Sequence, residues 1–128
     1  MYMTKKPIVS NQSAPPVGPY SPAVLVNDWL YISGQIPLLP DGSLVSGDMV
    51  AEVRQVLTNI EAVLTAANAQ WNHVVKVNIY TTDLSQFDTI NDVYAEFVQP
   101  PFPARAAVEV AALPKGVRIE MEAIAYVK

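Results

Sequence analysis

Two charged side chains in the C-terminal third of the chain have the chemistry to bind a small anion and activate water beside it. Arg105 lies in segment 104–110 and Glu120 in segment 118–123, and apolar residues surround both. A guanidinium can bind a carboxylate through two parallel hydrogen bonds, and a carboxylate can hold a water molecule or accept its proton. The pair predicts a pocket for a small carboxylic acid. The alternative is a surface cross-strand ion pair worth under about 1 kcal/mol.

Strand periodicity decides which side chains accompany this pair. On an extended strand, Arg105, Ala107 and Glu109 share one face, and the small Ala107 leaves space beside the guanidinium. On the next segment Glu120 and Glu122 share a face. Glu120 therefore cannot turn into the core without a register slip that moves its apolar neighbours out.

Four further residues are candidates for lining such a pocket. Ser33 and Gly34 end a predicted strand with a hydroxyl and a residue without Cβ, which lets a ligand approach the backbone closely; an ordinary turn is the alternative. Tyr20 lies in the rigid segment 18–21, where a packing role is the alternative. Asn91 lies on a helix face that we expect to be buried, and its amide requires partners, either backbone groups or a ligand.

Composition and motifs argue against several other chemistries. The chain has no cysteine and a single histidine, His73, which we expect to be solvated, so the sequence predicts neither a metal site nor a Ser-His-Asp relay. It has no phosphate-binding glycine-rich loop before a helix, and we predict no cofactor. A net charge of −4 and a longest basic run of Lys5-Lys6 argue against nucleic-acid binding.

The length of 128 residues predicts one domain spanning 1–128. Hydrophobic residues make up 51% of the chain and charged residues 16%, against about 25% charged in typical soluble domains, which predicts self-association. A monomer with a large core is the alternative. No signal-like start and no long apolar run are present, so we predict a cytoplasmic protein that does not contact a membrane.

Hydrophobic periodicity predicts an α+β fold. The expected elements are a hairpin 23–26 and 29–33, a short strand 43–45, a helix 48–69, a strand 74–80, a helix 83–98 and strands 104–110 and 118–123. The buried face of the second helix is expected to consist of Leu84, Phe87, Ile90, Tyr94 and Phe97. This order favours two helices packed on one face of a mixed, largely antiparallel sheet, whose other face is free for a second subunit.

Four segments in this order resemble the Rid family, also called the YjgF family, and the match extends over nearly the whole chain. They are Gly-Pro-Tyr-Ser-Pro-Ala at 18–23, Ile-Ser-Gly-Gln-Ile-Pro at 32–37, Phe-Pro-Ala-Arg at 102–105 and Val-Arg-Ile-Glu-Met-Glu-Ala at 117–123, with Asn-Asp-Val-Tyr-Ala-Glu-Phe at 91–97 between the second and third. The resemblance implies a chorismate-mutase-like fold and a homotrimer with ligand clefts between subunits. It also implies cofactor-free hydrolysis of reactive 2-imino acids and their enamine tautomers, such as 2-aminoacrylate and 2-iminobutanoate, to 2-keto acids and ammonia.

The resemblance also implies a role for each candidate residue. Arg105 would bind the substrate carboxylate and Glu120 would position and activate water. The residues that would line the cleft are Tyr20, Ser33, Gly34 and Asn91. Ala107, beside Arg105, stands where many relatives carry a cysteine, so this chain cannot require a thiol there. The short loop 99–101 suggests a different cleft rim.

Three other functions stay open at this point. A non-catalytic sensor or carrier of small carboxylates could use the same Arg105. A pathway-specific deaminase could use the same Arg105 and Glu120 on a different imino acid. Ribonuclease activity or inhibition of translation has been attached to some relatives, but the acidic net charge argues against it.

Overall fold

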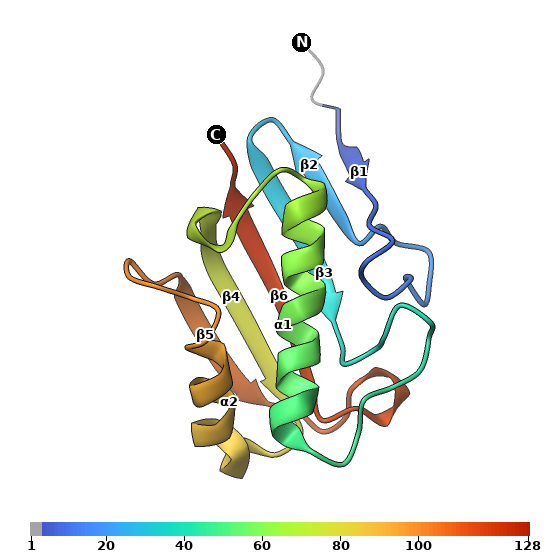
Figure 1. Cartoon of the computed structure of the whole chain (residues 1–128), viewed down its shortest axis with the longest axis vertical. Coiled ribbons are helices and arrows are strands. Elements are labelled where there is room, and N and C mark those ends of the chain that lie inside the picture. Colours follow the sequence, from blue (N-terminus) through green and yellow to red (C-terminus); the bar gives the residue numbers. More distant parts are fainter. Residues whose placement is uncertain (1–3) are drawn as a thin grey trace.

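The computed structural model describes residues 4–128, so the first three residues of the predicted 1–128 domain lie outside the described part. Within that part, a six-stranded sheet forms one layer and two α-helices form the other (Figure 1). The strands are β1 (Lys6–Ile8), β2 (Ala23–Val26), β3 (Trp29–Gln35), β4 (Val74–Thr81), β5 (Ala104–Glu109) and β6 (Ile119–Tyr126). The helices are α1 (Met49–Ala66) and α2 (Phe87–Tyr94), and short 3-10 turns are η1 (Trp71–His73), η2 (Leu84–Gln86) and η3 (Pro114–Gly116).

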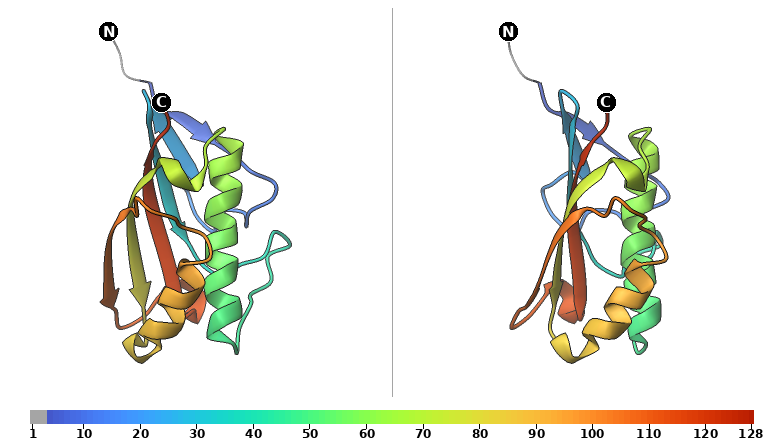
Figure 2. Two further views of the ribbon diagram at one scale, coloured as in Figure 1. Left: turned by 60° about the vertical axis from the view of Figure 1, so that its left-hand side comes forward. Right: turned by 90° about the vertical axis from the view of Figure 1, so that its left-hand side faces the viewer.

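The strand order in the sheet is β1-β2-β3-β6-β4-β5. Every neighbouring pair is antiparallel except β4 and β5, which are parallel because α2 crosses over between them. Both helices lie on the same side of the sheet, as the edge-on view shows (Figure 2). The predicted α+β class with a mixed, largely antiparallel sheet is confirmed.

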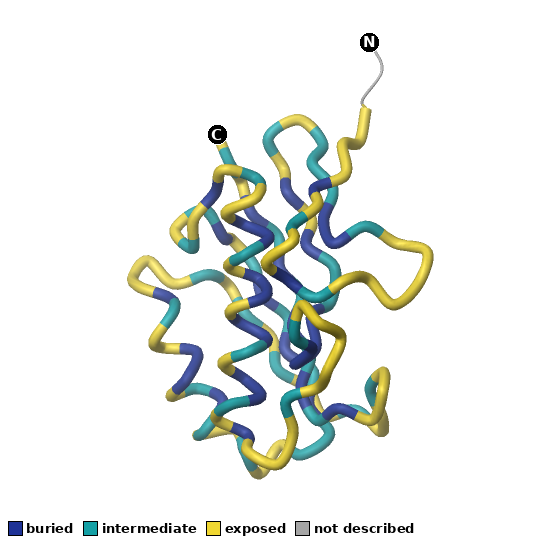
Figure 3. Tube along the Cα trace, turned by 45° about the vertical axis from the view of Figure 1, so that its right-hand side comes forward, coloured by how far each residue is buried: buried dark blue, intermediate teal, exposed yellow. Residues whose placement is uncertain are grey.

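Helix α1 supplies much of the core. Its stripe of Val53, Leu57, Ile60 and Leu64 is fully buried against the sheet, while the opposite side of the helix is exposed (Figure 3). The predicted cap is confirmed, because the Asp48 side chain accepts the backbone N–H of Val50 at 3.1 Å. Helix α1 ends at Ala66, somewhat before the predicted end at residue 69.

The predicted hairpin is confirmed with a longer second strand. Val26 pairs with Trp29 across the two-residue turn, and Asn27 has the positive φ of 55° that such turns require. Strand β3 continues past the predicted end at residue 33 to Gln35, where it still pairs with β6. This extension places the Ser33-Gly34 pair inside the sheet.

The second helix is shorter than predicted, and its buried face differs. Helix α2 follows the η2 turn and ends well before residue 98. Its buried side chains are Ile90, Val93 and Tyr94. Leu84 and Phe87 are 38% and 36% exposed, so their predicted burial is wrong: they lie in the η2 turn and at the first position of α2, before the stripe that packs on the sheet.

Two predictions about short strands also need correction. The expected strand 43–45 is only an isolated bridge between Leu38 and Leu44. Strand β1 arises from the proline-containing lead-in, for which no strand was expected. It pairs with β2 at the sheet edge, where Pro7 is tolerated because an edge strand can leave one N–H side unpaired.

Candidate active site

A β-bulge near the end of β3 positions the residues of one half of the candidate site. The register with β6 shifts between Ile32 and Gln35, so that Ser33 and Gly34 together lie opposite the single residue Glu122. Ile32 and Gln35 are both buried on the helix side. In a regular strand, side chains alternate between the two faces, and one of Ser33 and Gly34 would point into the core. The bulge instead keeps both residues between the two core positions Ile32 and Gln35.

The Glu120 carboxyl group lies directly against Gly34. A Cβ built on Gly34 would be 2.9 Å from the Glu120 carboxyl carbon, so only glycine allows this approach. Among residues 4–128, no hydrogen-bond donor reaches the Glu120 carboxylate. Burial raises the pKa of Glu120 above its usual range, and the nearby negative charge of Glu122 raises the same pKa further.

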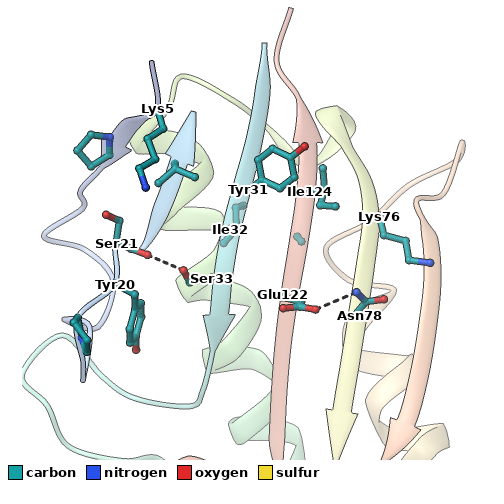
Figure 4. A pocket seen from close by; sticks show the side chains of 14 residues that line it. Lys5, Tyr20, Ser21, Tyr31, Ile32, Ser33, Lys76, Asn78, Glu122 and Ile124 are labelled. Carbon is teal, nitrogen blue, oxygen red and sulfur yellow. Dashed lines mark hydrogen bonds between the residues drawn. The ribbon is translucent and has the colours of Figure 1, made fainter. Parts of the chain in front are cut away.

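The proline-rich segment before β2 brings Tyr20 to the same place. The Tyr20 hydroxyl accepts the backbone N–H of Val17 at 3.1 Å, and the Ser33 hydroxyl donates to the backbone carbonyl of Ser21 at 2.7 Å (Figure 4). Tyr20 and Gly34 line one small cavity. The structure thus brings together four predicted residues, Tyr20, Ser33, Gly34 and Glu120, and we call this group the Glu120 half-site.

Arg105 lies on the opposite face of the sheet from Glu120. In the parallel β4–β5 pair, Arg105 is the register partner of Val77, which is fully buried on the helix side. Glu120 is the register partner of Tyr80, whose side chain lies on the face that no helix covers. Because paired residues share a face, the backbone of the sheet separates Arg105 from Glu120 within one chain. The alternative of a cross-strand ion pair between them is wrong.

The Arg105 guanidinium is held by aromatic rings of α2. Its central carbon lies 5.5 Å from the ring centre of Phe87 and 5.0 Å from that of Tyr94. These are cation–π distances, and within the described residues no carboxylate pairs with Arg105. The guanidinium is therefore fixed in place while its hydrogen-bonding edge is free for an anion.

Arg105 and α2 form a pocket of about 310 Å³ whose lining also includes Asn91, Tyr94, Phe102 and Pro103. The side-chain oxygens of Asn91 and Tyr94 are buried and have no hydrogen-bond partner among the described residues. Asn91 was predicted to be buried and to need a partner, and the structure shows its oxygen buried and the partner lacking.

Ala107 follows Arg105 on the same face of β5 and packs at the edge of the core. We call Arg105, Asn91 and Ala107 the Arg105 half-site.

The aromatic partners of Arg105 were not found by sequence reasoning. Phe87, Asn91 and Tyr94 recur at steps of four and three residues, so a helical face that carries all three was visible in the sequence. Sequence reasoning interpreted this face as wholly buried and so did not predict that its rings contact Arg105. That contact depends on α2 packing beside the edge strand β5, which the sequence does not show.

A groove of about 650 Å³ lies on the uncovered face of the sheet, between the lead-in and β4. It contains Tyr20 and Ser33 of the Glu120 half-site, together with Glu122, Lys5 and Lys76 (Figure 4). Sequence reasoning did not single out these last three as site residues.

His73 has a structural role in the described chain. Its Nδ1 accepts the backbone N–H of Gln70 at 2.9 Å, which caps the η1 turn. Within residues 4–128 no group of three His, Asp or Glu side chains could hold a metal ion, and no described helix is long and apolar enough to cross a membrane.

The fold, a mixed sheet with two helices on one face, is that of a Rid-type protein. The family described as Endoribonuclease L-PSP matches residues 11–127, and the chain belongs to this family. The resemblance to the Rid family is confirmed.

Relatives extend over nearly the whole chain. The 2-iminobutanoate/2-iminopropanoate deaminase of Bos taurus is 51% identical over 120 residues, which are 92% of this chain and 88% of the relative. The crystal structure of RidA from an Antarctic Psychrobacter is 44% identical with a TM-score of 0.92 and covers 95% of this chain and 99% of that one. Escherichia coli TdcF, solved with bound serine, is 37% identical with a TM-score of 0.92 and covers 97% of this chain and 100% of its own.

Proposed function

We propose that this chain is a cofactor-independent deaminase that hydrolyses 2-imino acids and their enamine tautomers to 2-keto acids and ammonia. The bovine relative bears the name of this activity at 51% identity. The observation that carries the proposal is the pair of half-sites. Within residues 4–128, Arg105 has no carboxylate partner, and Glu120 has a raised pKa and no hydrogen-bond donor.

The proposed active unit is a homotrimer in which the Arg105 half-site of one copy faces the Glu120 half-site of the next. A single copy cannot place both residues on one small substrate, because the sheet lies between them. The uncovered face also exposes large aromatic side chains: Trp29 is 41% exposed, Tyr31 47% and Tyr126 39%. Such a surface favours burial against another copy.

The proposed reaction uses orientation and proton transfer alone. Arg105 binds the carboxylate and so fixes the imine carbon, while Glu120 holds a water molecule and takes its proton as the oxygen adds to that carbon. That proton passes to the nitrogen to give a tetrahedral intermediate with a hydroxyl and an amino group. Glu120 then moves the hydroxyl proton to the same nitrogen, the C–N bond breaks as the C=O bond of the keto acid forms, and ammonia leaves. An enamine substrate must first take up a proton on its terminal carbon. A carboxyl group with a raised pKa is suited to each of these transfers.

Trapping of the imine tests this function. A serine/threonine dehydratase generates 2-aminoacrylate or 2-iminobutanoate in solution, and semicarbazide traps what is not hydrolysed. The wild-type chain should suppress semicarbazone formation, and Arg105→Ala should not, with circular dichroism as the control for folding. If neither protein suppresses trapping while the wild type binds a 2-keto acid in calorimetry, the chain is a carboxylate-binding protein and the proposal fails.

The charge of this chain argues against the ribonuclease activity named in the family's description. The net charge is −4, and no basic run is longer than two residues. Such a chain has little with which to follow a phosphate backbone. The cytoplasmic location expected from the sequence stays a prediction.

A further inference from the structure

Glu122 is held by two donors from β4. Its Oε1 accepts the hydroxyl of Tyr80 at 2.7 Å and the side-chain amide of Asn78 at 3.1 Å (Figure 4 draws the latter bond). Asn78 is the direct register partner of Glu122, but Tyr80 is the register partner of Glu120. The phenol therefore reaches diagonally to Glu122 and does not bond Glu120, its own cross-strand partner.

The carboxyl groups of Glu120 and Glu122 have opposite surroundings. Glu120 and Glu122 lie on the same face of β6, and residues two apart on a strand are about 7 Å apart. Two donors fix the position of the Glu122 carboxylate. Glu120 has no donor in the described part of the chain and packs against Gly34. Two neighbouring carboxyl groups do not ionise independently, and the one without donors is the one that keeps its proton longer.

We propose that Glu122 is a positioning residue of the candidate site. Fixed by Tyr80 and Asn78, it holds a negative charge next to Glu120 and so makes Glu120 the carboxyl group that carries and passes the proton. This inference rests on the proposed function for its catalytic meaning. Glu122 itself would not touch the substrate.

The other ionisable groups near Glu120 and Glu122 make no ion pair with either carboxyl group in the described structure. Tyr20, Tyr31, Lys5 and Lys76 line the same groove as Glu122. The Lys76 side chain extends toward β5 and away from Glu122, and Lys5 lies on the far side of β2 and β3 (Figure 4). No described ion pair joins either lysine to the two carboxyl groups.

Strand β5 adds no charge on this face. Its residues in register with Asn78 and Tyr80 are Ala106 and Val108. The hydrogen bonds from β4 are therefore the specific contacts that distinguish Glu122 from Glu120.

The experiment measures the protonation of Glu120 directly and then its use in catalysis. Carboxyl-detected ¹³C NMR follows the titration of Glu120, assigned with Glu120→Gln, in the wild type and in Glu122→Gln. The pH profile of kcat/KM for imine hydrolysis is recorded for wild type and Glu122→Gln. We expect Glu122→Gln to lower the Glu120 midpoint and to move the corresponding limb of the pH profile to lower pH by the same amount.

Glu61→Gln is the matched control. Glu61 also accepts one side-chain donor, the indole N–H of Trp71 at 3.1 Å, but it lies on α1 outside both half-sites. This variant should leave the Glu120 midpoint and the pH profile as in the wild type. A change equal to that of Glu122→Gln would overturn the specific role of Glu122.

A second variant keeps the proposal testable if Glu122→Gln does not fold. Tyr80→Phe removes one donor to Glu122, so the negative charge next to Glu120 is held less firmly and the Glu120 midpoint should fall. Unchanged midpoints in folded Glu122→Gln and Tyr80→Phe would refute the inference. A wild type without deaminase activity would instead refute the proposed function, and the NMR titration would still decide whether the two carboxyl groups are coupled.

Discussion

Gly34 and Glu120 are in contact at a distance that no other residue type at position 34 would allow. A Cβ there would be 2.9 Å from the Glu120 carboxyl carbon. In Gly34→Ala the Glu120 side chain must move, and because the obstructing atoms are the end of a flexible side chain, the fold should survive. We expect unfolding curves close to those of the wild type and a deaminase rate lower by roughly 10- to 100-fold.

The control is a glycine substitution that should lower stability but leave the deaminase rate unchanged. Gly42 has a φ of 90°, and a Cβ built on it would meet nothing within 4 Å. Gly42→Ala should therefore lower the free energy of unfolding by about 1 kcal/mol through backbone strain and leave the rate unchanged. An active Gly34→Ala protein would show that the position of Glu120 does not matter for the reaction.

The separation of Arg105 from Glu120 predicts complementation between two inactive variants. Arg105→Ala and Glu120→Gln should each be inactive alone, but subunits mixed by joint unfolding and refolding can form clefts with Arg105 from one copy and Glu120 from another. In an evenly mixed trimer of the proposed kind, about a quarter of the clefts contain both residues, so about a quarter of the wild-type rate should return.

The double variant Arg105→Ala/Glu120→Gln, mixed with itself in the same way, is the control and should stay inactive. If mixing the single variants restores no activity although mass spectrometry shows mixed oligomers, the two residues do not act from different subunits.

The ion pair between Arg118 and Glu52 predicts a strong effect on stability. Glu52 is 2% exposed in α1, and Arg118, just before β6, contacts both its carboxylate oxygens, with Nε 3.2 Å from Oε1. Arg118→Ala leaves this buried carboxylate without its partner. We expect the free energy of unfolding in urea to fall by about 2–3 kcal/mol, below the full value for a buried pair because Arg118 is partly exposed.

Arg54→Ala is the matched control, because Arg54 also pairs with one glutamate. It contacts both oxygens of Glu96 at 2.9 Å, but the two side chains are 47% and 51% exposed. Its loss should change the free energy of unfolding by less than about 1 kcal/mol. If both substitutions lowered the free energy of unfolding equally, burial of Glu52 would not explain the effect of Arg118→Ala.

The raised pKa of Glu120 predicts how stability depends on pH. The folded chain binds this proton more tightly than the unfolded chain, so the contribution of Glu120 to stability is full below its ordinary pKa of 4.5 and is lost as the pH rises through the raised pKa. Glu120→Gln should therefore increase Tm relative to the wild type at neutral pH, and the increase should disappear in acid. Thermal unfolding at a fixed protein concentration measures this, and a constant difference across the pH range would contradict it.

Sequence patterns predicted the elements well where local chemistry determines them. The stripe of α1 and its cap at Asp48 follow from helical periodicity, and the turn at Asn27 follows from its tolerance of positive φ. Strand β1 was missed because the many prolines of the lead-in argue against regular structure, and only pairing at the edge of β2 explains it.

The candidate site was predictable in its residues but not in their arrangement. Alternation along a strand places Ala107 with Arg105, and Glu122 with Glu120, but it cannot say which face of the sheet each set takes. That depends on the parallel register of β4 with β5 and the antiparallel register of β4 with β6, which join residues far apart in the sequence. The bulge at Gly34 is also a property of two paired strands.

The sheet that separates Arg105 from Glu120 also prevents the two charges from neutralising each other inside one chain. In a lone copy the guanidinium lies over two aromatic rings and the carboxyl group lies against a glycine, so both are ready for use but neither has its counterpart. If copies must meet to complete a cleft, the rate per copy should fall on dilution. The concentration of the protein would then control the rate of the reaction.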